Sequence, residues 1–241
     1  EILITLLIPI GTKYKKRICS NINVIEYKSR DSRRNPFLLF EIFRIVKTSK
    51  FDIVHTHFTK STEIFNLLNK LLKIKHVATK HNSRKGKIFN KLENVIAVSK
   101  DVAKSIDNDS TVIYNGLIPA KIDNDIKKNE KFTIIAIGRL DKIKGFDILI
   151  NEMSKVKYDF ILNIVGDGSE YQNLTKLISE KELQNSINLL GFRDDIPQLL
   201  AESHLQVITS HSEGFSIAFL EGLFYTKLII YTNVGVMKEI D

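Results

Sequence analysis

Four charged residues in the second half of the sequence are placed where an anionic ligand could bind. Arg139 and Lys144 lie in the loop that follows an apolar stretch with the pattern of a buried strand. Glu213 closes the loop after another such stretch, and Glu221 lies within the helix expected next. Because two cations beside one sheet edge can hold a diphosphate, we expect Arg139 and Lys144 to form an anion site.

The segment after Glu213 has the signals of a helix that begins at a sheet edge. Gly214 permits a tight turn, and Ser216 can cap the helix that follows. We expect the apolar residues Ile217, Leu220 and Phe224 to face the sheet. The N-terminus of such a helix points out of the carboxyl edge of a parallel sheet, where phosphate groups bind.

Glycines mark two further strand ends, in Gly166–Asp167–Gly168 and in Gly191–Phe192–Arg193. A glycine lets a ligand approach the backbone closely, but two glycines so spaced more often form a tight turn. We therefore expect a tight turn at Gly166–Asp167–Gly168.

Three short motifs could suggest a metal site. His55 and His57 are alternate residues of an expected strand, so their side chains share a face. No cysteine or acidic third ligand follows them, and we interpret the pair as structural. The motifs Asp107–Asn108–Asp109 and Asp123–Asn124–Asp125 fall in polar turns, where such residues form local hydrogen bonds. We therefore predict no metal site.

Apolar stretches alternate with helical patterns along the whole sequence, which is typical of parallel sheets covered on both faces. A polar stretch at residues 121–131 separates two such runs. We therefore predict an α/β fold of two Rossmann-like doubly wound domains that face a cleft, with the ligand site in that cleft. Two of the shorter expected helices are Lys100–Ile106 and Val236–Ile240.

Composition places the chain among globular proteins. Of its 241 residues, 43% are hydrophobic and 27% are charged, so disorder is excluded. The single cysteine, Cys19, excludes an intramolecular disulfide and fits a reducing compartment. No apolar stretch approaches the roughly 20 residues that a transmembrane helix needs. We expect a cytoplasmic protein.

Positive charge is concentrated in the first half. Residues 1–120 carry a formal charge of +12, and the remaining residues carry −4. Such an excess suits a phosphate-bearing acceptor, an anionic membrane surface or nucleic acid, although a solvated lysine-rich surface is an equal alternative. One hypothesis is peripheral contact with the cytoplasmic face of a membrane. The basic clusters are Lys13, Lys15, Lys16 and Arg17; Arg30, Arg33 and Arg34; and Lys80, Arg84, Lys85 and Lys87.

Four segments of the second half occur in a distinctive order: IGRLDKIKGFDILI, IVGDGSE, LLGFRDDIPQLL and SHSEGFSIAFLEGL. As a set, over residues 132–241, they resemble the donor-binding domain of the family 4 (group 1) retaining glycosyltransferases, which have the GT-B fold. The first half resembles the family's acceptor domain less sharply, through FDIVHTHF, VATKHNSR, VIAVSKDV and VIYNGL.

The resemblance implies a role for each matching residue. Glu213 matches the glutamate that faces the donor sugar, and Glu221 matches the one that binds the ribose hydroxyls. Arg139 and Lys144 match the pair that neutralises the donor diphosphate. His81 matches a histidine that reaches the transferred sugar.

Further donor contacts are implied for two loops. Backbone amides near the helix N-terminus would meet sugar and phosphate oxygens, and a second loop would lie near the nucleobase. The residues concerned are Gly214, Phe215, Ser216 and Ile217 in the first loop, and Gly191, Phe192 and Arg193 in the second.

The resemblance also implies two domains that are both incomplete. We predict that residues 1–118 form the acceptor-side domain, without the family's first strand and glycine-rich loop. Residues 119–241 would form the donor-binding domain, without its C-terminal part. This fragment is therefore expected to depend on the missing parts for activity.

The function implied is transfer of a sugar from a nucleotide-sugar donor to a glycan or lipid-linked acceptor. Retention of anomeric configuration, independence of metal and the absence of a cofactor follow from the same resemblance. The pathway would be assembly of cell-surface polysaccharide, lipopolysaccharide or glycan. Two alternatives are a nucleotide-sugar epimerase on the same fold and a basic nucleic-acid-binding module, although no nucleic-acid-binding motif is found.

Overall fold

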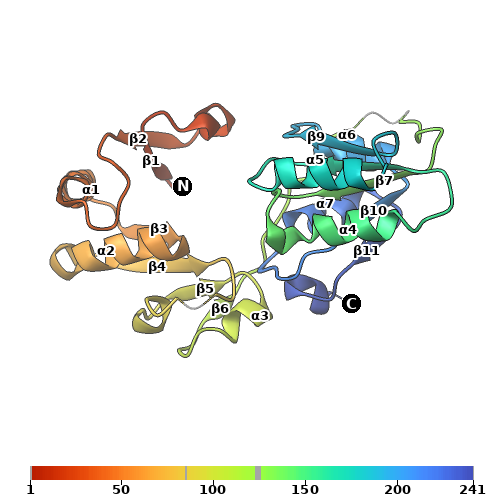
Figure 1. The fold of residues 1–241 in the computed structure, drawn as a ribbon. Coiled ribbons are helices and arrows are strands. Elements are labelled where there is room, and N and C mark those ends of the chain that lie inside the picture. The colour runs from red at the N-terminus through yellow and green to blue at the C-terminus, as the bar shows by residue number, and fades with distance from the viewer. Residues whose placement is uncertain (1, 85, 123–125, 241) are drawn as a thin grey trace. The chain divides into compact units, whose positions relative to one another are not determined.

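The computed structural model of the chain describes residues 2–84, 86–122 and 126–240. The chain divides into two compact units. The first comprises residues 1–96 and 106–111, and the second comprises residues 97–105 and 112–241. Both contain parallel strands connected by helices (Figure 1).

A five-stranded parallel sheet forms the centre of the second unit, in the order β11-β10-β7-β8-β9. The chain runs outward from β7 to β9 and then returns to the other side of β7 at β10. The direction of winding therefore reverses between β7 and β10, as in doubly wound folds. The strands are β7 (Thr133–Ile137), β8 (Ile161–Val165), β9 (Ile187–Gly191), β10 (Leu205–Ile208) and β11 (Ile229–Tyr231).

Helices cover both faces of this sheet. Ile134 and Ala136 of β7 pack in a cluster with side chains of α4 and α5, whereas Ile135 packs with Leu200 of α6. Alternate strand residues point to opposite faces, so the continuous apolar run of β7 serves two cores. The helical segments of this unit are α3 (Lys100–Ala103), η3 (Lys142–Lys144), α4 (Phe146–Met153), α5 (Tyr171–Glu180), α6 (Ile196–Glu202), α7 (Ile217–Tyr225) and η4 (Gly235–Lys238), where η marks a 3₁₀ helix.

Strands of the first half form two separate sheets. One pairs β1 with β2 in parallel, and the other has the order β3-β4-β5-β6. The strands are β1 (Thr5–Pro9), β2 (Asn23–Tyr27), β3 (Ile53–His57), β4 (Lys75–Lys80), β5 (Val95–Ala97) and β6 (Thr111–Val112). The helical segments are η1 (Lys13–Arg17), α1 (Pro36–Ser49), α2 (Phe58–Leu72) and η2 (Phe89–Lys91).

The start of α1 follows from its sequence. Pro36 is the first helical residue, and the Asn35 side chain accepts a hydrogen bond of 3.1 Å from the amide of Phe37. The buried side chains of α1 pack against those of α2 in one core. They are Leu38, Ile42 and Val46 of α1 and Ile64, Phe65 and Leu68 of α2.

One sequence prediction about α7 was wrong. Ile217 and Phe224 are exposed, and the buried residues are Phe219 and Gly222. The segment is apolar on nearly every side, so periodicity could not select the inner face. Contact with β10 selects it instead, because the Gln206 side chain donates a hydrogen bond of 2.7 Å to the carbonyl of Ala218.

Two predicted helices are shorter or tighter than expected. The segment predicted as Lys100–Ile106 ends at Ala103, and the one predicted as Val236–Ile240 is a 3₁₀ turn, η4. A carboxylate joins the two segments: Glu239 accepts hydrogen bonds of 3.0 and 2.8 Å from the amides of Lys100 and Asp101. Exposed amides at the start of α3 are thereby satisfied.

The core of the first unit contains a histidine that should make its stability depend on pH. His76 of β4 lies against Phe65, and its Nε2 is 2.8 Å from the hydroxyl oxygen of Thr56. Burial, followed by the charge of His55, lowers the pKa of His76 from 6.5 to about 4. The unfolded chain therefore binds a proton at a higher pH than the folded chain does.

We predict that the free energy of unfolding is constant above pH 6.5 and falls as the pH drops from 6.5 towards 4. A loss of about 1–3 kcal/mol is expected from His76. Urea unfolding at a series of pH values measures it. His76→Gln keeps a hydrogen-bonding atom near Thr56 without titrating, and should flatten the dependence. An equally steep fall in this variant would contradict the assignment.

Candidate active site

The carboxyl ends of β7 and β10 lie side by side, because the two strands are paired in parallel. The loops after them leave the sheet in opposite directions, which opens a crevice at this edge in folds of this type. The loop after β7 contains Arg139 and Lys144, and the loop after β10 contains Glu213. The two loops therefore bring these three residues to one edge of the sheet.

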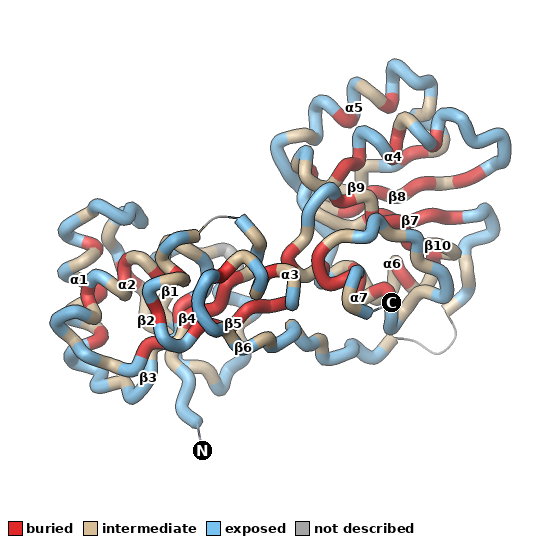
Figure 2. The backbone as a smooth tube through the Cα atoms, turned by 90° about the horizontal axis from the view of Figure 1, so that it is seen from below, coloured by how far each residue is buried: buried red, intermediate tan, exposed pale blue. Residues whose placement is uncertain are grey.

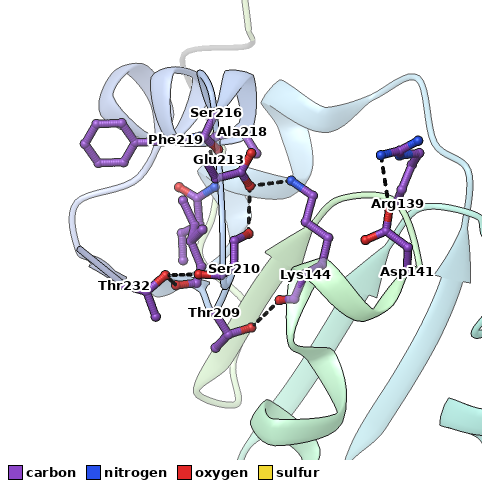
Figure 3. A network of polar contacts seen from close by, with 12 residues as sticks. Arg139, Asp141, Lys144, Thr209, Ser210, Glu213, Ser216, Ala218, Phe219 and Thr232 are labelled. Atoms are coloured by element: carbon purple, nitrogen blue, oxygen red, sulfur yellow. Dashed lines mark hydrogen bonds and ion pairs between the residues drawn. The ribbon is translucent and has the colours of Figure 1, made fainter. Parts of the chain in front are cut away.

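Lys144 and Glu213 form an ion pair at this edge. The Nζ atom of Lys144 lies 2.5 Å from Oε1 of Glu213 (Figure 3). The two side chains are only 18% and 10% exposed, so their attraction is screened less than that of a surface pair. A buried charge without a partner is costly, so each of the two charges stabilises the other in this position.

Hydroxyl groups fix the loop that carries Glu213. The Ser210 hydroxyl donates a hydrogen bond of 2.7 Å to Oε1 of Glu213. The Thr232 hydroxyl in turn donates one of 2.6 Å to the carbonyl of Ser210. The Thr209 hydroxyl donates to the carbonyl of Lys144 at 2.8 Å, so the Thr209 side chain joins its loop to the backbone of the other (Figure 3).

Gly145 allows the two loops to approach. Its φ of +64° lies in the left-handed region, and a Cβ atom there would lie 2.4 Å from the carbonyl oxygen of Thr209. Both facts exclude a side chain at this position without movement of the backbone. Next to it, the amide of His211 donates a hydrogen bond of 2.8 Å to the carbonyl of Ile143.

Arg139 is placed differently from Lys144. Its guanidinium lies 3.1 Å from the carboxylate of Asp141, and its side chain is 79% exposed. Figure 3 shows the Arg139 side chain directed to Asp141 and not to Glu213. The structure thus joins Lys144 and Glu213 closely, and it leaves Arg139 at the edge of the same loop.

Glu221 lies on α7, five residues after the Ser216 cap. Ser216 begins the helix as predicted, since its side chain accepts a hydrogen bond from the amide of Phe219 at 3.3 Å. Burial raises the pKa of the Glu221 carboxyl. Of the other residues in this loop, Gly214 is buried and Phe215 packs in the core cluster that contains Phe219.

The predicted nucleobase loop follows β9, which lies beyond β8 on one side of β7. Gly191 has a φ of +66°, Phe192 is half exposed, and Arg193 donates a hydrogen bond of 2.8 Å from Nε to Asp195. This loop therefore lies at the same sheet edge as Lys144, separated from β7 by one strand.

Close backbone contact explains the glycines after β8. A Cβ atom on Gly166 would lie 2.0 Å from the carbonyl oxygen of Gly138, the residue that follows β7. The amide of Leu140 also donates a hydrogen bond of 2.9 Å to the carbonyl of Asp167. These glycines therefore support the Arg139 loop by packing against it, as a turn would.

His81 belongs to the first unit, where it follows β4. Its Nε2 lies 3.0 Å from Nδ1 of His57, and the Phe58 ring stacks on it with a centroid distance of 4.4 Å. His55 contacts His57 with a ring distance of 4.4 Å. Three histidines and a phenylalanine thus gather at the carboxyl ends of β3 and β4.

Two of the three motifs considered for metal binding lie within the described residues. Asp107 and Asn108 form hydrogen bonds with Asn90, which lies 17 and 18 residues away in sequence, so these polar groups join two separate loops. The segment Asp123–Asp125 lies outside the described residues. Within residues 2–84, 86–122 and 126–240, no group of three or more His, Cys, Asp or Glu side chains is arranged to hold a metal ion.

Several residues of the site were not predicted from the sequence. They act through hydrogen bonds or packing on the predicted residues, as Ser210 acts on Glu213 and Asp141 acts on Arg139. A run of small hydroxyl residues directly after an apolar strand was the available signal. The residues are Asp141, Thr209, Ser210 and Thr232 in the second unit, and Phe58 in the first.

Comparison with family models matches both halves of the chain. Residues 119–240 match the model described as Glycosyl transferases group 1, and residues 11–121 match Glycosyltransferase Family 4. In the described part of the chain, no helix combines the length and apolar character needed to span a bilayer.

Two curated proteins and one crystal structure illustrate the similarity. A glycosyltransferase of Methanocaldococcus jannaschii, MJ1178, is 30% identical over 81% of this chain and 60% of its own length. The N-acetylgalactosamine-N,N'-diacetylbacillosaminyl-diphospho-undecaprenol 4-alpha-N-acetylgalactosaminyltransferase of Campylobacter jejuni is 32% identical over 51% of this chain and 34% of its own length. The chain thus spans less than two thirds of either relative.

The crystal structure is that of HepE from Anabaena in complex with UDP-glucose. It superposes with a TM-score of 0.78 over 92% of this chain and 70% of HepE, at 21% identity. At this level of identity the comparison shows a common fold, and that fold is GT-B. The prediction of an α/β fold with parallel, Rossmann-like sheets is confirmed.

Gly145→Ala should destabilise the second unit by about 2–3 kcal/mol, because it combines left-handed backbone strain with a clash against Thr209. Urea unfolding measures the loss. Gly116→Ala is a matched control, because its Cβ would have no neighbour within 4 Å and its φ is not left-handed. Equal stability of the two variants would show that the loops do not need this close contact.

Proposed function

We propose, because the chain belongs to the family of group 1 glycosyl transferases, that it moves a sugar from a nucleotide-sugar donor to a glycan or lipid-linked acceptor. Residues 119–241 would bind the donor, and residues 1–118 would serve the acceptor side. The observation that carries the proposal is the Lys144–Glu213 ion pair at the reversal of winding between β7 and β10.

The chemistry of transfer requires this kind of site. Breaking the bond between a sugar and a diphosphate builds negative charge on the departing diphosphate. Preorganised cations and helix N-termini in a dry crevice stabilise such charge well. In this proposal, the groups that would do so are Lys144, which is largely buried, Arg139 on the same loop and the N-terminus of α7.

We propose that the two glutamates bind hydroxyl groups of the donor. Glu213 is fixed by Lys144 and Ser210, so its remaining acceptor positions have a defined direction. Glu221 is partly buried on α7 and would accept from the ribose hydroxyls. Amides of residues 214–217 would contact sugar and phosphate oxygens, and the loop at residues 191–193 would contact the base.

The relatives suggest which compounds to test first. HepE was crystallised with UDP-glucose, so UDP and UDP-sugars are the first donors to try. The name of the Campylobacter jejuni enzyme specifies an acceptor on diphospho-undecaprenol, a lipid carrier. An acceptor of the same class would bring the protein to a membrane surface. Assembly of a cell-surface polysaccharide, lipopolysaccharide or other glycan is the proposed setting.

We further propose retention of anomeric configuration without a protein nucleophile, and transfer without a metal. The positive charges of Arg139 and Lys144 would neutralise the diphosphate in place of a metal ion. His81 would contact the transferred sugar from the first unit.

One face of α1 fits the proposed membrane contact. Phe37 and Phe40 are 77% and 67% exposed, and Arg44 and Lys47 follow them at helical spacing on the same face. The buried residues of α1 recur at helical spacing on the opposite side of the helix, so the exposed face is not part of the core. Figure 2 shows buried and exposed segments alternating along α1. Exposed aromatic rings beside cations are typical of surfaces that bind anionic lipid.

Neighbouring acidic residues reduce the charge of this positive face only in part, because two of the three are paired with cations of their own. Glu41 accepts hydrogen bonds of 2.9 Å from the amides of Lys28 and Ser29. Asp31 pairs with Lys60 at 2.6 Å, and Glu63 pairs with Arg33 at 2.8 Å. Arg30 and Arg34 extend the exposed positive surface in the turn before α1.

Lys144→Ala should lower turnover of the donor by roughly 10²-fold, since a preorganised cation contributes that much to stabilisation of developing charge. Binding of UDP, measured by calorimetry, should weaken in parallel. Lys142→Ala is the control, because Lys142 is an exposed neighbour on the same turn. Unchanged turnover and UDP binding in a folded Lys144→Ala variant would refute the assignment.

Replacing Phe37 and Phe40 together by Ser should reduce cosedimentation with vesicles that contain phosphatidylglycerol by about tenfold, because two apolar anchors are lost. Binding to vesicles of phosphatidylcholine alone should be weak for both forms. Tyr158→Ser, which removes an exposed aromatic residue of the second unit, should have no effect. Equal binding to anionic and neutral vesicles would argue against the surface.

A further inference from the structure

The imidazole of His81 is held from two sides by residues that the resemblance does not explain. His57, the last residue of β3, contacts it at 3.0 Å between ring nitrogens. Phe58, the first residue of α2, stacks on it with an angle of 26° between the rings. Two consecutive residues thus fix both the plane of the ring and one of its nitrogens.

The contact between His57 and His81 links their protonation. A distance of 3.0 Å between Nδ1 of His57 and Nε2 of His81 is a hydrogen bond, so one nitrogen carries a proton and the other does not. If His57 donates, then the other nitrogen of neutral His81 carries a proton. If His81 donates, its other nitrogen is bare. His57 therefore decides whether the second nitrogen of His81 donates or accepts.

Both rings are also kept neutral near pH 7. Burial, followed by the charges of His55 and His81, lowers the pKa of His57 to about 4. Burial, followed by the charge of His55, lowers the pKa of His81. Among the described residues, the titratable groups that contact these two rings are the histidines of the cluster themselves. His55 is held by the Thr79 hydroxyl at 2.7 Å. A neutral His81 follows from this arrangement, and its tautomer is coupled to that of His57 through their hydrogen bond.

Phe58 is otherwise an unfavourable choice at its position. Its φ of +63° lies in the left-handed region, which costs a bulky residue free energy. Its side chain is 57% exposed, so burial in the core does not compensate. The stacking contact with His81 is the interaction that accounts for a phenylalanine here. Strained residues of this kind are found at functional sites more often than elsewhere.

We propose that His57 and Phe58 are positioning residues that hold His81 in one ring orientation and set its tautomer for its contact with the sugar. The contact with the sugar rests on the proposed function, whereas the control of the tautomer and orientation does not. His57 acts by hydrogen bonding and Phe58 acts by stacking.

Two variants of His57 test the hydrogen bond. The amide group of Asn can take the place of Nδ1, so His57→Asn keeps a partner for His81, whereas His57→Phe removes it. Nitrogen NMR of the labelled chain reports the tautomer and titration of His81. We expect one tautomer in the wild type and in His57→Asn, and averaged tautomers in His57→Phe. An unchanged His81 spectrum in His57→Phe would overturn the proposal.

Kinetics give the second readout. His57→Phe should lower kcat/KM by about tenfold, as expected for one misplaced hydrogen bond, and His57→Asn should restore part of the loss. Altered tautomers without any change in kcat/KM would overturn the link to catalysis. Failure of the proposed function itself is distinguishable, because the wild type would then show no transfer while its His81 spectrum kept a single tautomer.

The role of Phe58 is tested by a variant in which melting temperature and kcat/KM should respond in opposite ways. Phe58→Gly removes the backbone strain together with the ring, so the melting temperature should stay constant or rise while kcat/KM falls. Phe58→Leu keeps the strain and loses the stacking, so it should lower both. A residue with only a structural role would lower the melting temperature in Phe58→Gly. That result, or full activity of Phe58→Gly, would overturn the role given to Phe58.

Discussion

The ion pair between Lys144 and Glu213 is the interaction on which the site depends, because it couples two loops that leave the sheet in opposite directions. Each charge is largely withdrawn from water, and each would be costly without the other. The pair is therefore as much a constraint on the loops as a source of stability. A ligand with two phosphates would meet a cation already held at the sheet edge, with little reorganisation left to perform.

Backbone packing makes this pair possible. Gly145 lets the Lys144 loop approach Thr209, and Gly166 lets the neighbouring turn approach Gly138. Hydroxyl groups of Ser210 and Thr232 then set the direction of the carboxylate and its loop. The site is thus built from contacts that a sequence pattern reveals poorly, since a glycine or serine at a strand end has many ordinary explanations.

The sequence was informative where one physical signal dominated. Strong apolar periodicity predicted the strands, and Asn35 before Pro36 predicted the start of α1. Prediction failed where apolar residues occur on every side of a helix, as on α7. The inner face of α7 depends on a contact with Gln206 of β10. It also could not show that Arg139 is paired with Asp141 while Lys144 is paired with Glu213, because both cations precede possible acids in the same way. Long-range geometry decides such cases.

The second unit holds a positive charge at Lys144, whereas the first unit keeps its clustered histidines uncharged. The proposed reaction gives a reason for both. Departure of a diphosphate builds negative charge, which the cation Lys144 can stabilise, whereas the sugar gains positive charge as its bond breaks. A cationic histidine beside that sugar would oppose the reaction. Desolvation makes protonation of each of His55, His57 and His81 unfavourable, and the charge of His55 adds to this effect at His57 and His81. A histidine cluster is therefore suited to a polar contact that must remain uncharged, which a lysine or arginine could not provide.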